Sequence, residues 1–535
     1  MKKFFYLLIF VGLVYSAKTQ IFQNEWIDYN KTYYKFKIGP FGYDVVGAPV
    51  RRGVVRITQS ALAAAGLGNI PAEQFQLWRD GEEVRIYISQ TSGILSSSDY
   101  IEFIGEIANG KPDKQLYNDS TYQLSDIWNL ESDSAAYFLT VNSATSNKRY
   151  ATIANNVASA TIAPEKNFMF TTGRYYRTFI NNGFGVHVEQ NLYLSSYDKG
   201  EGFTSRPVRN NNSIYGQIQM PQNFSALFID TTASSATARF SMIGDAPYDR
   251  NVKIWLNGDQ LIQFPMGYFL SKKLDVPVAV SRIKGDFANF TIQNLSTVNE
   301  DALRVATIEL EYPRVFNFAG SDVFRFFIEG SDQGRYLKIA NFNRGTADAV
   351  LYDVTNGKRY IANTDIPDSL RFLLAPSQEK YYLFLGRGDG STAKFVTTFQ
   401  QRQYTNFSQQ ANQGDYLIIT NPLLYGTGQN NYVQQYSDYR SSDSGGHYNT
   451  KIVDIRDLED QFAYGISMHP LAIKNFLRFA RENFTQQPKY VFLIGKGISY
   501  PAYRDPNLGH SETEPLTQQL NLIPVFGYPG SDNLL

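Results

Sequence analysis

The hydrophobic pattern changes near Asp415, and this change limits the possible folds more than any other feature of the chain. Upstream, short segments such as Tyr33–Ile38 alternate apolar and polar residues, as strands with one buried face do. Downstream, continuous apolar runs occur at Tyr416–Thr420, 452–455 and Tyr490–Ile494. Runs without alternation are typical of parallel strands that are covered on both faces. The sequence therefore predicts antiparallel β domains first and an α/β unit last.

A helix is predicted between the second and third of these apolar runs, over residues 470–484. Proline is favoured in the first turn of a helix, and Pro470 stands there. One face of this helix is apolar, and its members are Ile473, Phe476, Leu477, Ala480 and Phe484. Strand, helix and strand at this spacing predict a parallel βαβ unit. Such sheets bind ligands at the carboxyl ends of their strands, here Asn421, 454–460 and 495–500.

The fold class predicted for the whole chain is multidomain and mostly β, with β-sandwich-like domains followed by the start of an α/β domain. Turn sequences separate the expected strands, as Asp80-Gly81 and Asn257-Gly258 do. The predicted organisation is a signal peptide at 1–19, an N-terminal β domain at 20–150, a β-sandwich-like domain at 151–315, an Ig-like β domain at 316–400, a linker at 401–414 and the α/β region at 415–535.

The amino terminus has the features of a secretory signal. Lys2 and Lys3 precede an apolar run at 4–15 that is too short to span a bilayer comfortably, and small and polar residues follow at 16–20. We expect cleavage within this last stretch and export of the mature protein. The alternative is an uncleaved anchor helix.

Composition excludes several classes of function. Lys and Arg number 50 and Asp and Glu number 50, so no net charge attracts nucleic acid. The chain has no cysteine, which excludes disulfides, thiolate catalysis and cysteine-based zinc or iron–sulfur sites within it. Tyr (37) and Phe (38) are abundant, which favours sheet over helix.

The α/β region resembles the start of the gingipain-type (C25) cysteine peptidase domain. The matching segments are 415–420, Tyr464-Gly465, 470–477, 488–495, 523–527 and Ser531-Asp532-Asn533. Four upstream segments, 53–57, 99–103, 113–117 and 133–139, resemble the N-terminal region of PorU-type sortases of the type IX secretion system of Bacteroidetes.

This resemblance implies a caspase-like peptidase domain carried behind β domains. It implies a cysteine-type endopeptidase that cleaves the sorting domains of exported cargo proteins. The implied partners are these cargo proteins and other type IX secretion components, and the implied location is the bacterial cell surface or outer membrane. The family's nucleophilic Cys and its His are expected beyond Leu535, so the chain is interpreted as an N-terminal fragment. No catalytic residue, cofactor-binding residue, cofactor or metal ligand is assigned within it. The alternative function is a non-catalytic surface or secretion module that binds cargo or partners through its β domains.

The chain has four histidines that could act as the base of a Cys–His or Ser–His pair. His469 precedes Pro470 and is expected to cap or flank the helix. His447 follows two glycines in a polar loop and is expected to be solvated. His510 lies in the loop after the third strand, near the expected cleft, and His187 has no visible partner.

Three further motifs have a functional and a structural interpretation. The acidic run Asp454, Asp457, Glu459 and Asp460 could bind calcium, but a solvated loop is favoured. Gly495-Lys496-Gly497 follows a strand but lacks the remaining phosphate-loop spacing. Arg387-Gly388-Asp389 is the adhesion tripeptide, but a glycine turn is expected after the apolar strand at 381–385, and this structural interpretation is favoured.

Overall fold

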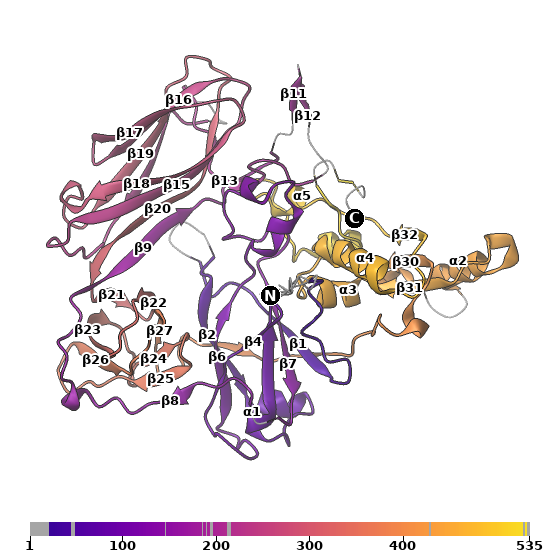
Figure 1. Cartoon of the computed structure of the whole chain (residues 1–535), viewed down its shortest axis with the longest axis horizontal. Coiled ribbons are helices and arrows are strands. Elements are labelled where there is room, and N and C mark those ends of the chain that lie inside the picture. Colours follow the sequence, from indigo (N-terminus) through magenta and orange to yellow (C-terminus); the bar gives the residue numbers. More distant parts are fainter. Residues whose placement is uncertain are drawn as a thin grey trace, which may run out of the picture.

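A computed structural model of the chain describes residues 21–43, 49–144, 146–183, 186–188, 190–192, 196–210, 216–426, 430–527 and 530–531. The predicted signal peptide lies outside these residues. Three β regions lie on one side of the molecule and one α/β region lies on the other, beside the first β region (Figure 1). The predicted fold class, mostly β followed by an α/β region, is confirmed.

The first β region is built from two sheets. One has the order β29-β1-β7-β3-β4 and the other β28-β2-β6-β5. The elements are β1 (Tyr33–Ile38), β2 (Arg52–Thr58), α1 (Gln59–Ala64), β3 (Phe75–Arg79), β4 (Glu82–Val84), β5 (Tyr87–Ile88), β6 (Tyr100–Glu106), β7 (Ala135–Val141), β28 (Lys394–Val396) and β29 (Gln400–Arg402). Their inward side chains, among them Val55, Phe75 and Phe103, form one buried core. The Asp80-Gly81 turn between β3 and β4 takes the left-handed conformation that a tight hairpin requires, with φ of 50° and 77°.

The second β region is a sandwich of two four-stranded antiparallel sheets, β14-β19-β16-β17 and β18-β15-β20-β9. Its strands are β9 (Asn167–Tyr175), β14 (Gln219–Phe224), β15 (Ser235–Gly244), β16 (Arg250–Leu256), β17 (Asp259–Met266), β18 (Ser271–Ala279), β19 (Ala288–Asn294) and β20 (Leu303–Val315). The Asn257-Gly258 turn joins β16 to β17 as predicted. Two short antiparallel strand pairs also occur in this part of the chain: β10 (Phe179–Asn181) with β13 (Gly202–Thr204), and β11 (Val186–Val188) with β12 (Gln190–Leu192).

The third β region also has two sheets, β22-β27-β24-β25-β8 and β21-β23-β26. Its strands are β8 (Ala151–Thr152), β21 (Asn317–Ser321), β22 (Val323–Ile328), β23 (Arg335–Phe342), β24 (Val350–Asp353), β25 (Lys358–Ile361), β26 (Ser369–Leu374) and β27 (Tyr381–Gly386). Strand pairing crosses the boundaries drawn from sequence. Ala151 of β8 pairs with Lys358 in the third region, while β28 and β29 return to the first.

The α/β region has a parallel sheet of order β31-β30-β32, which confirms the predicted βαβ unit. Its elements are β30 (Tyr416–Thr420), α2 (Tyr432–Ser441), β31 (Thr450–Asp454), α3 (Ile455–Phe462), α4 (Leu471–Asn483), β32 (Tyr490–Ile494), α5 (Pro501–Arg504) and α6 (Pro515–Leu520). Leu417 and Ile419 pack with α3 and α4, while Ile418 packs with Val433 of α2. Both faces of β30 are therefore buried, which explains its continuous apolar sequence.

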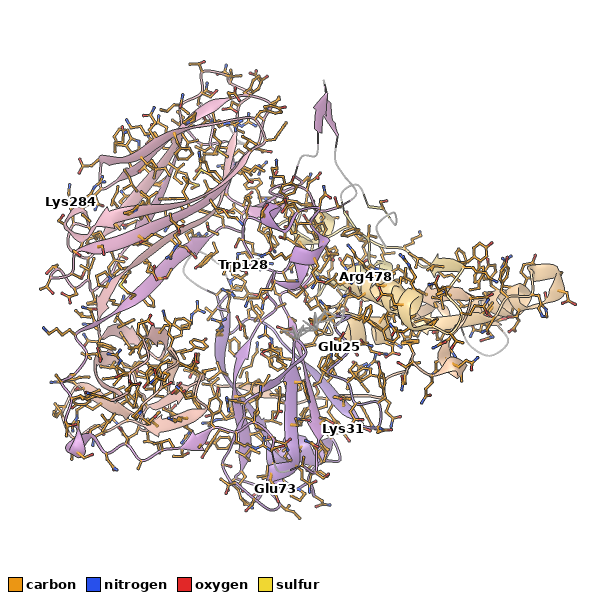
Figure 2. All side chains as sticks on the ribbon, viewed as in Figure 1. Glu25, Lys31, Glu73, Trp128, Lys284 and Arg478 are labelled. Atoms are coloured by element: carbon orange, nitrogen blue, oxygen red, sulfur yellow. The ribbon has the colours of Figure 1, made fainter. Side chains whose placement is uncertain are left out.

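The α/β region and the first β region share one hydrophobic core. Phe22 meets Phe479 of α4 edge to face at 5.4 Å, and Trp128 and Leu130 belong to the same buried cluster as Leu417. The contact region is labelled in Figure 2 by Trp128, Glu25 and Arg478. The outer end of the first β region is labelled by Glu73, and that of the sandwich by Lys284. This shared cluster packs the two regions against each other. In the part of the chain that the structure describes, no helix is both long and apolar enough to cross a membrane.

Candidate functional site

A pocket of about 390 Å³ lies at the carboxyl ends of β30 and β31. Asn421, which follows β30, and Arg456, which follows β31, line one side of it. Lys35 and Lys37 of β1 and Arg402 of β29 line it from the first β region. This is the edge at which parallel sheets bind their ligands. The first β region therefore supplies one wall of the cleft of the α/β region.

A buried ion triad joins the two walls. Asp460 of α3 accepts a hydrogen bond from Lys35 through one carboxylate oxygen and from the Nε of Arg402, at 2.8 Å, through the other. The Asp460 side chain is only 1% exposed. Two cations on one carboxylate fix α3 against β1 and β29, because each charge would lack compensation if its partners moved away.

The ammonium group of Lys37 faces the pocket with a hydroxyl as its hydrogen-bond partner. It donates to Ser467 Oγ at 2.6 Å, and the structure gives it no salt bridge among the described residues. Burial and the neighbouring Lys35 lower the pKa of Lys37. Burial raises the pKa of Glu459, which accepts a hydrogen bond from the Met468 amide at 2.7 Å. Lys37 is therefore the lining cation with the most freedom to bind a carbonyl or carboxylate oxygen.

Two buried carboxyl groups meet tyrosines of the α/β region next to this pocket. Glu131 accepts hydrogen bonds from Tyr503 of α5 and, at 3.2 Å, from Tyr197. Glu201 accepts one from Tyr500 at 2.9 Å. Burial raises the pKa of Glu131 to about 8 and that of Glu201 well above its usual value. Glu131 therefore favours its protonated form at neutral pH, in which it joins the first β region to α5 as a neutral group.

His469 is the most deeply enclosed of the predicted histidines. Its Nε2 lies 2.8 Å from Asp113 Oδ1, and its Nδ1 accepts from the Leu471 amide at 3.3 Å, so Nε2 carries the proton. The prediction that it flanks the start of α4 is confirmed. Asp113 also accepts from the Leu130 amide at 2.9 Å. Both side chains are fully buried, and the pair links the α/β region to the first β region.

His447 and His510 do not line the pocket, but the loop that carries His510 does reach it, through Glu512 and Thr513. His447 is exposed as predicted and meets Asp443 at 3.0 Å. His510 is half-exposed and pairs with Glu514 at 2.9 Å. The backbone of His187 lies in β11, and its side chain is outside the described residues.

The favoured interpretation of the acidic run as a solvated loop is wrong. The run begins at Asp454, which caps α3 by accepting from the Arg456 amide at 2.9 Å, and the helix then buries Asp457, Glu459 and Asp460. These carboxylates are ion-paired or hydrogen-bonded rather than solvated. Within the described residues, no group of three or more acidic or histidine side chains could hold a metal ion.

The two glycine motifs have structural roles. The loop that contains Gly497 packs on Val525, because a Cβ at Gly497 would lie only 1.9 Å from that side chain. Asp389 of the Arg-Gly-Asp tripeptide accepts hydrogen bonds from Ser391 and Thr346, and Arg387 donates to Asn343. These contacts confirm the interpretation of the tripeptide as a turn.

Sequence reasoning did not find Lys35, Lys37, Arg402 and Glu131 as pocket residues. They stand far from the α/β region in the sequence, and the strands that carry them have ordinary alternating or polar patterns. The available signal was Lys35 itself, a charged residue on the buried face of a strand, where an ion partner is needed.

Comparisons with known proteins agree with the geometry of this region. Residues 409–535 match peptidase family C25. The crystal structure of dimeric latent PorU from Porphyromonas gingivalis is similar over 92% of this chain and 44% of the PorU chain, with 14% sequence identity and a TM-score of 0.54. The chain thus spans less than half the length of that protein, and at this identity the likeness concerns the fold. No curated protein sequence gives a significant match.

Two carbohydrate-binding modules also align with part of the chain. One is the CBM36-1 domain of a xylanase from the hindgut metagenome of Trinervitermes trinervoides, with 8% identity, 26% of this chain and 96% of the module covered, and a TM-score of 0.17. The other is CBM36 in complex with calcium and xylotriose, with 10% identity, 26% and 98% covered, and a TM-score of 0.17. These scores are too low to support a conclusion. Residues 409–535 are thus similar to peptidase family C25, and the fold over 92% of the chain is similar to that of PorU.

Proposed function

We propose that this chain is the N-terminal part of a secreted cysteine peptidase that acts as a type IX secretion sortase and cleaves the sorting domains of exported cargo proteins. The observation that carries the proposal is the PorU-like fold over 92% of the chain, together with the C25 match at 409–535. The proposed location is the bacterial cell surface or outer membrane. The proposed partners are cargo proteins and other components of that secretion system.

The reaction class proposed is thiolate attack on a peptide carbonyl. The C–N bond breaks as a histidine gives its proton to the leaving amine, and the acyl group then passes from sulfur to water or to an acceptor amine. This chain has no cysteine to supply that nucleophile. Its own contribution would be to bind and orient substrate, with Lys37 and Arg456 donating to oxygen atoms in the cleft.

A non-catalytic surface or secretion module, which binds cargo or partners through its β domains, is the second candidate. The continuation of the gene beyond Leu535 distinguishes the two. A His-Gly element followed by a cysteine after a buried strand supports the peptidase. A continuation without them supports the module.

The purified 535-residue chain is expected to leave peptides intact, because it has no thiol. Iodoacetamide should add no mass at cysteine, whereas it should inactivate a longer product that supplies the family's Cys and His. Fluorogenic peptides and intact-mass spectrometry measure both effects. Robust hydrolysis by the short chain, lost on His510→Ala, would show that a different nucleophile operates.

Export should remove about the first twenty residues, because Lys2 and Lys3 followed by a short apolar run form a cleavable signal. Intact-mass measurement of the surface fraction should find a mature chain that begins near Gln20. A surface-exposed protein that retains Met1 would contradict this and indicate an anchor.

A further inference from the structure

A second pocket, of about 350 Å³, adjoins the pocket at the carboxyl ends of β30 and β31. It is lined by residues 35–38 of β1 and by residues 394–400, which include β28 and its connection to β29, and we call it the β1 groove. The two pockets meet, because both are lined by Lys35, Lys37 and Gln400. A ligand in the candidate site can therefore extend along β1.

The charged side chains of the β1 groove are all basic. Among the described residues, its lining contains Lys35, Lys37 and Lys394 and neither Asp nor Glu. Asp460 compensates the charge of Lys35. The other two lysines form no salt bridge within the described residues, and each donates to neutral oxygen atoms instead. Positive charge that is not paired in a concave site attracts an anion.

Lys394 lies at the end of the groove that is farther along β1. It donates to the carbonyls of Gly39 at 3.0 Å and Pro40 at 2.8 Å. Burial alone lowers the pKa of Lys394, so no carboxylate contributes to the shift. The groove is therefore electropositive at this end as well as at Lys37.

The carboxyl groups that act on Lys37 electrostatically have other partners. They are Glu459, Glu512 and Asp460. Glu512 pairs with Arg504 at 3.3 Å, and Asp460 pairs with Lys35 and Arg402. Burial and Lys35 outweigh the three carboxyl groups, so the pKa of Lys37 is lowered. A carboxylate that a ligand brings to Lys37 would supply the missing compensation.

The rest of the lining suits an extended polypeptide chain. β29 pairs with Tyr33–Lys35, so among the described strands residues 36–38 of β1 pair with β7 alone. The edge of a sheet is where an extended peptide can add as a strand. Thr397 and Thr398 are exposed on the opposite wall, and their hydroxyls can donate and accept hydrogen bonds. Phe395, which is 52% exposed, offers an apolar surface.

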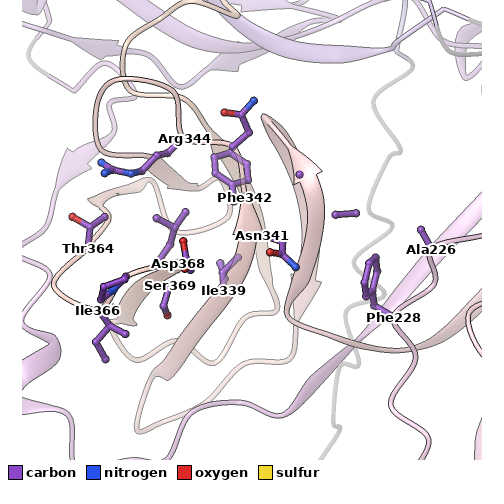
Figure 3. A pocket seen from close by; sticks show the side chains of 15 residues that line it. Ala226, Phe228, Ile339, Asn341, Phe342, Arg344, Thr364, Ile366, Asp368 and Ser369 are labelled. Carbon is purple, nitrogen blue, oxygen red and sulfur yellow. The ribbon is translucent and has the colours of Figure 1, made fainter.

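A larger cavity beside the third β region lacks such a charge preference. Its volume is about 860 Å³, and Phe228 and Phe342 line it (Figure 3). Its charged lining residues are Arg344 and Asp368, one of each sign. The charges of that cavity therefore do not select a ligand, whereas those of the β1 groove do.

We propose that the β1 groove binds an extended segment of a polypeptide substrate through an acidic side chain that Lys37 holds. The segment lies along residues 36–38, with its carboxylate at Lys37 and a neighbouring apolar side chain on Phe395. A polypeptide is favoured over a free anion because the groove joins a strand edge to the candidate site. The proposal rests on the proposed function in naming this segment as substrate, but the binding itself requires no thiol.

Isothermal titration calorimetry of the 535-residue chain with the blocked peptide acetyl-Thr-Val-Glu-Phe-Thr-amide tests the proposal. Glu is the only charged residue of this peptide, and Gln or Lys replaces it in two control peptides. The Glu peptide should bind about tenfold more tightly than the Gln peptide, and the Lys peptide should bind most weakly. Added salt should reduce the preference for Glu, because the attraction is between charges.

Substitution of Lys37 assigns the preference to this side chain. Lys37→Gln should weaken binding of the Glu peptide about tenfold and leave binding of the Gln peptide unchanged, which also shows that the groove is still folded. Lys37→Arg keeps the charge and should keep the preference. Lys284→Gln is the matched control, because Lys284 also donates to a backbone carbonyl but lies at the outer end of the sandwich (Figure 2). It should leave the binding of both peptides unchanged.

Three outcomes would overturn the proposal: equal binding of the Glu and Gln peptides, a preference for Glu that Lys37→Gln leaves unchanged, or inorganic phosphate that binds as tightly as the Glu peptide. None of these results bears on the proposed peptidase, because they concern binding alone. Conversely, a gene continuation without the His-Gly element and the cysteine would overturn the peptidase and leave the preference of the groove for acidic peptides intact.

Discussion

Glu131→Gln is expected to remove a large part of the decline in stability that the wild-type chain shows between about pH 4.5 and pH 8. Burial, with a smaller contribution from Asp113, raises the pKa of Glu131 from 4.5 to about 8, while Tyr503, Tyr197 and Arg504 oppose the shift. The folded chain therefore keeps a proton that the unfolded chain loses, so stability falls as pH rises through this window. Below it both states are protonated, and above it the full penalty is present.

The size of this effect follows from the shift. At about 1.4 kcal/mol per pKa unit, Glu131 lowers the free energy of unfolding by roughly 4 kcal/mol at pH 8 relative to pH 4. Glutamine does not ionise and can still hydrogen-bond to the tyrosines. Urea unfolding followed by tryptophan fluorescence at pH 5, 6.5 and 8 should show the variant gaining on the wild type as pH rises. If the free energies of unfolding of the variant and the wild type changed with pH in the same way, Glu131 would be solvated or ionised in the folded chain.

Asp460→Asn is expected to cost about 3–5 kcal/mol of unfolding free energy, because it leaves Lys35 and Arg402 as buried cations without their carboxylate. The Lys35 side chain is 9% exposed and that of Arg402 is 14% exposed, so water solvates their positive charges poorly once the carboxylate is lost. Urea unfolding at pH 7 measures the loss.

Asp454→Asn is the matched control for this experiment. Asp454 pairs with Arg456 at 2.9 Å, but the Arg456 side chain is 45% exposed, and asparagine keeps the cap of α3. Its effect should stay below about 1 kcal/mol. Equal effects of the two substitutions would mean that the triad at Asp460 is not electrostatically isolated from solvent.

Local pattern was sufficient to predict much of the fold. Tyr416–Thr420 and Tyr490–Ile494 are continuous apolar runs, and they pair in parallel because both faces of the sheet are covered. The Asp80-Gly81 and Asn257-Gly258 turns were also predictable, since their backbone requirement is local. Prediction failed for the acidic run that became α3. Asp460 is buried where Lys35 and Arg402 meet it from distant strands, and no local window contains that information.

The same limit applies to the candidate site. The carboxyl ends of the parallel strands located the pocket in advance. The opposite wall could not be predicted, because Lys37 and Glu131 reach it through the packing of the first β region on α3 and α5. The position of His469 beside the helix was predictable, whereas its partner Asp113 was not, since that contact spans two regions.

The return of β28 and β29 to the first β region determines when that region can close. Tyr33 pairs with Arg402, and Val55 pairs with Lys394, so each sheet takes a strand from the far end of the third region. Until residues 394–402 arrive, β1 and β2 are open edges of their sheets. Contacts this distant in sequence slow folding. A chain that emerges from its amino terminus therefore carries two unpaired edges throughout most of its synthesis, and we expect chaperones to bind there.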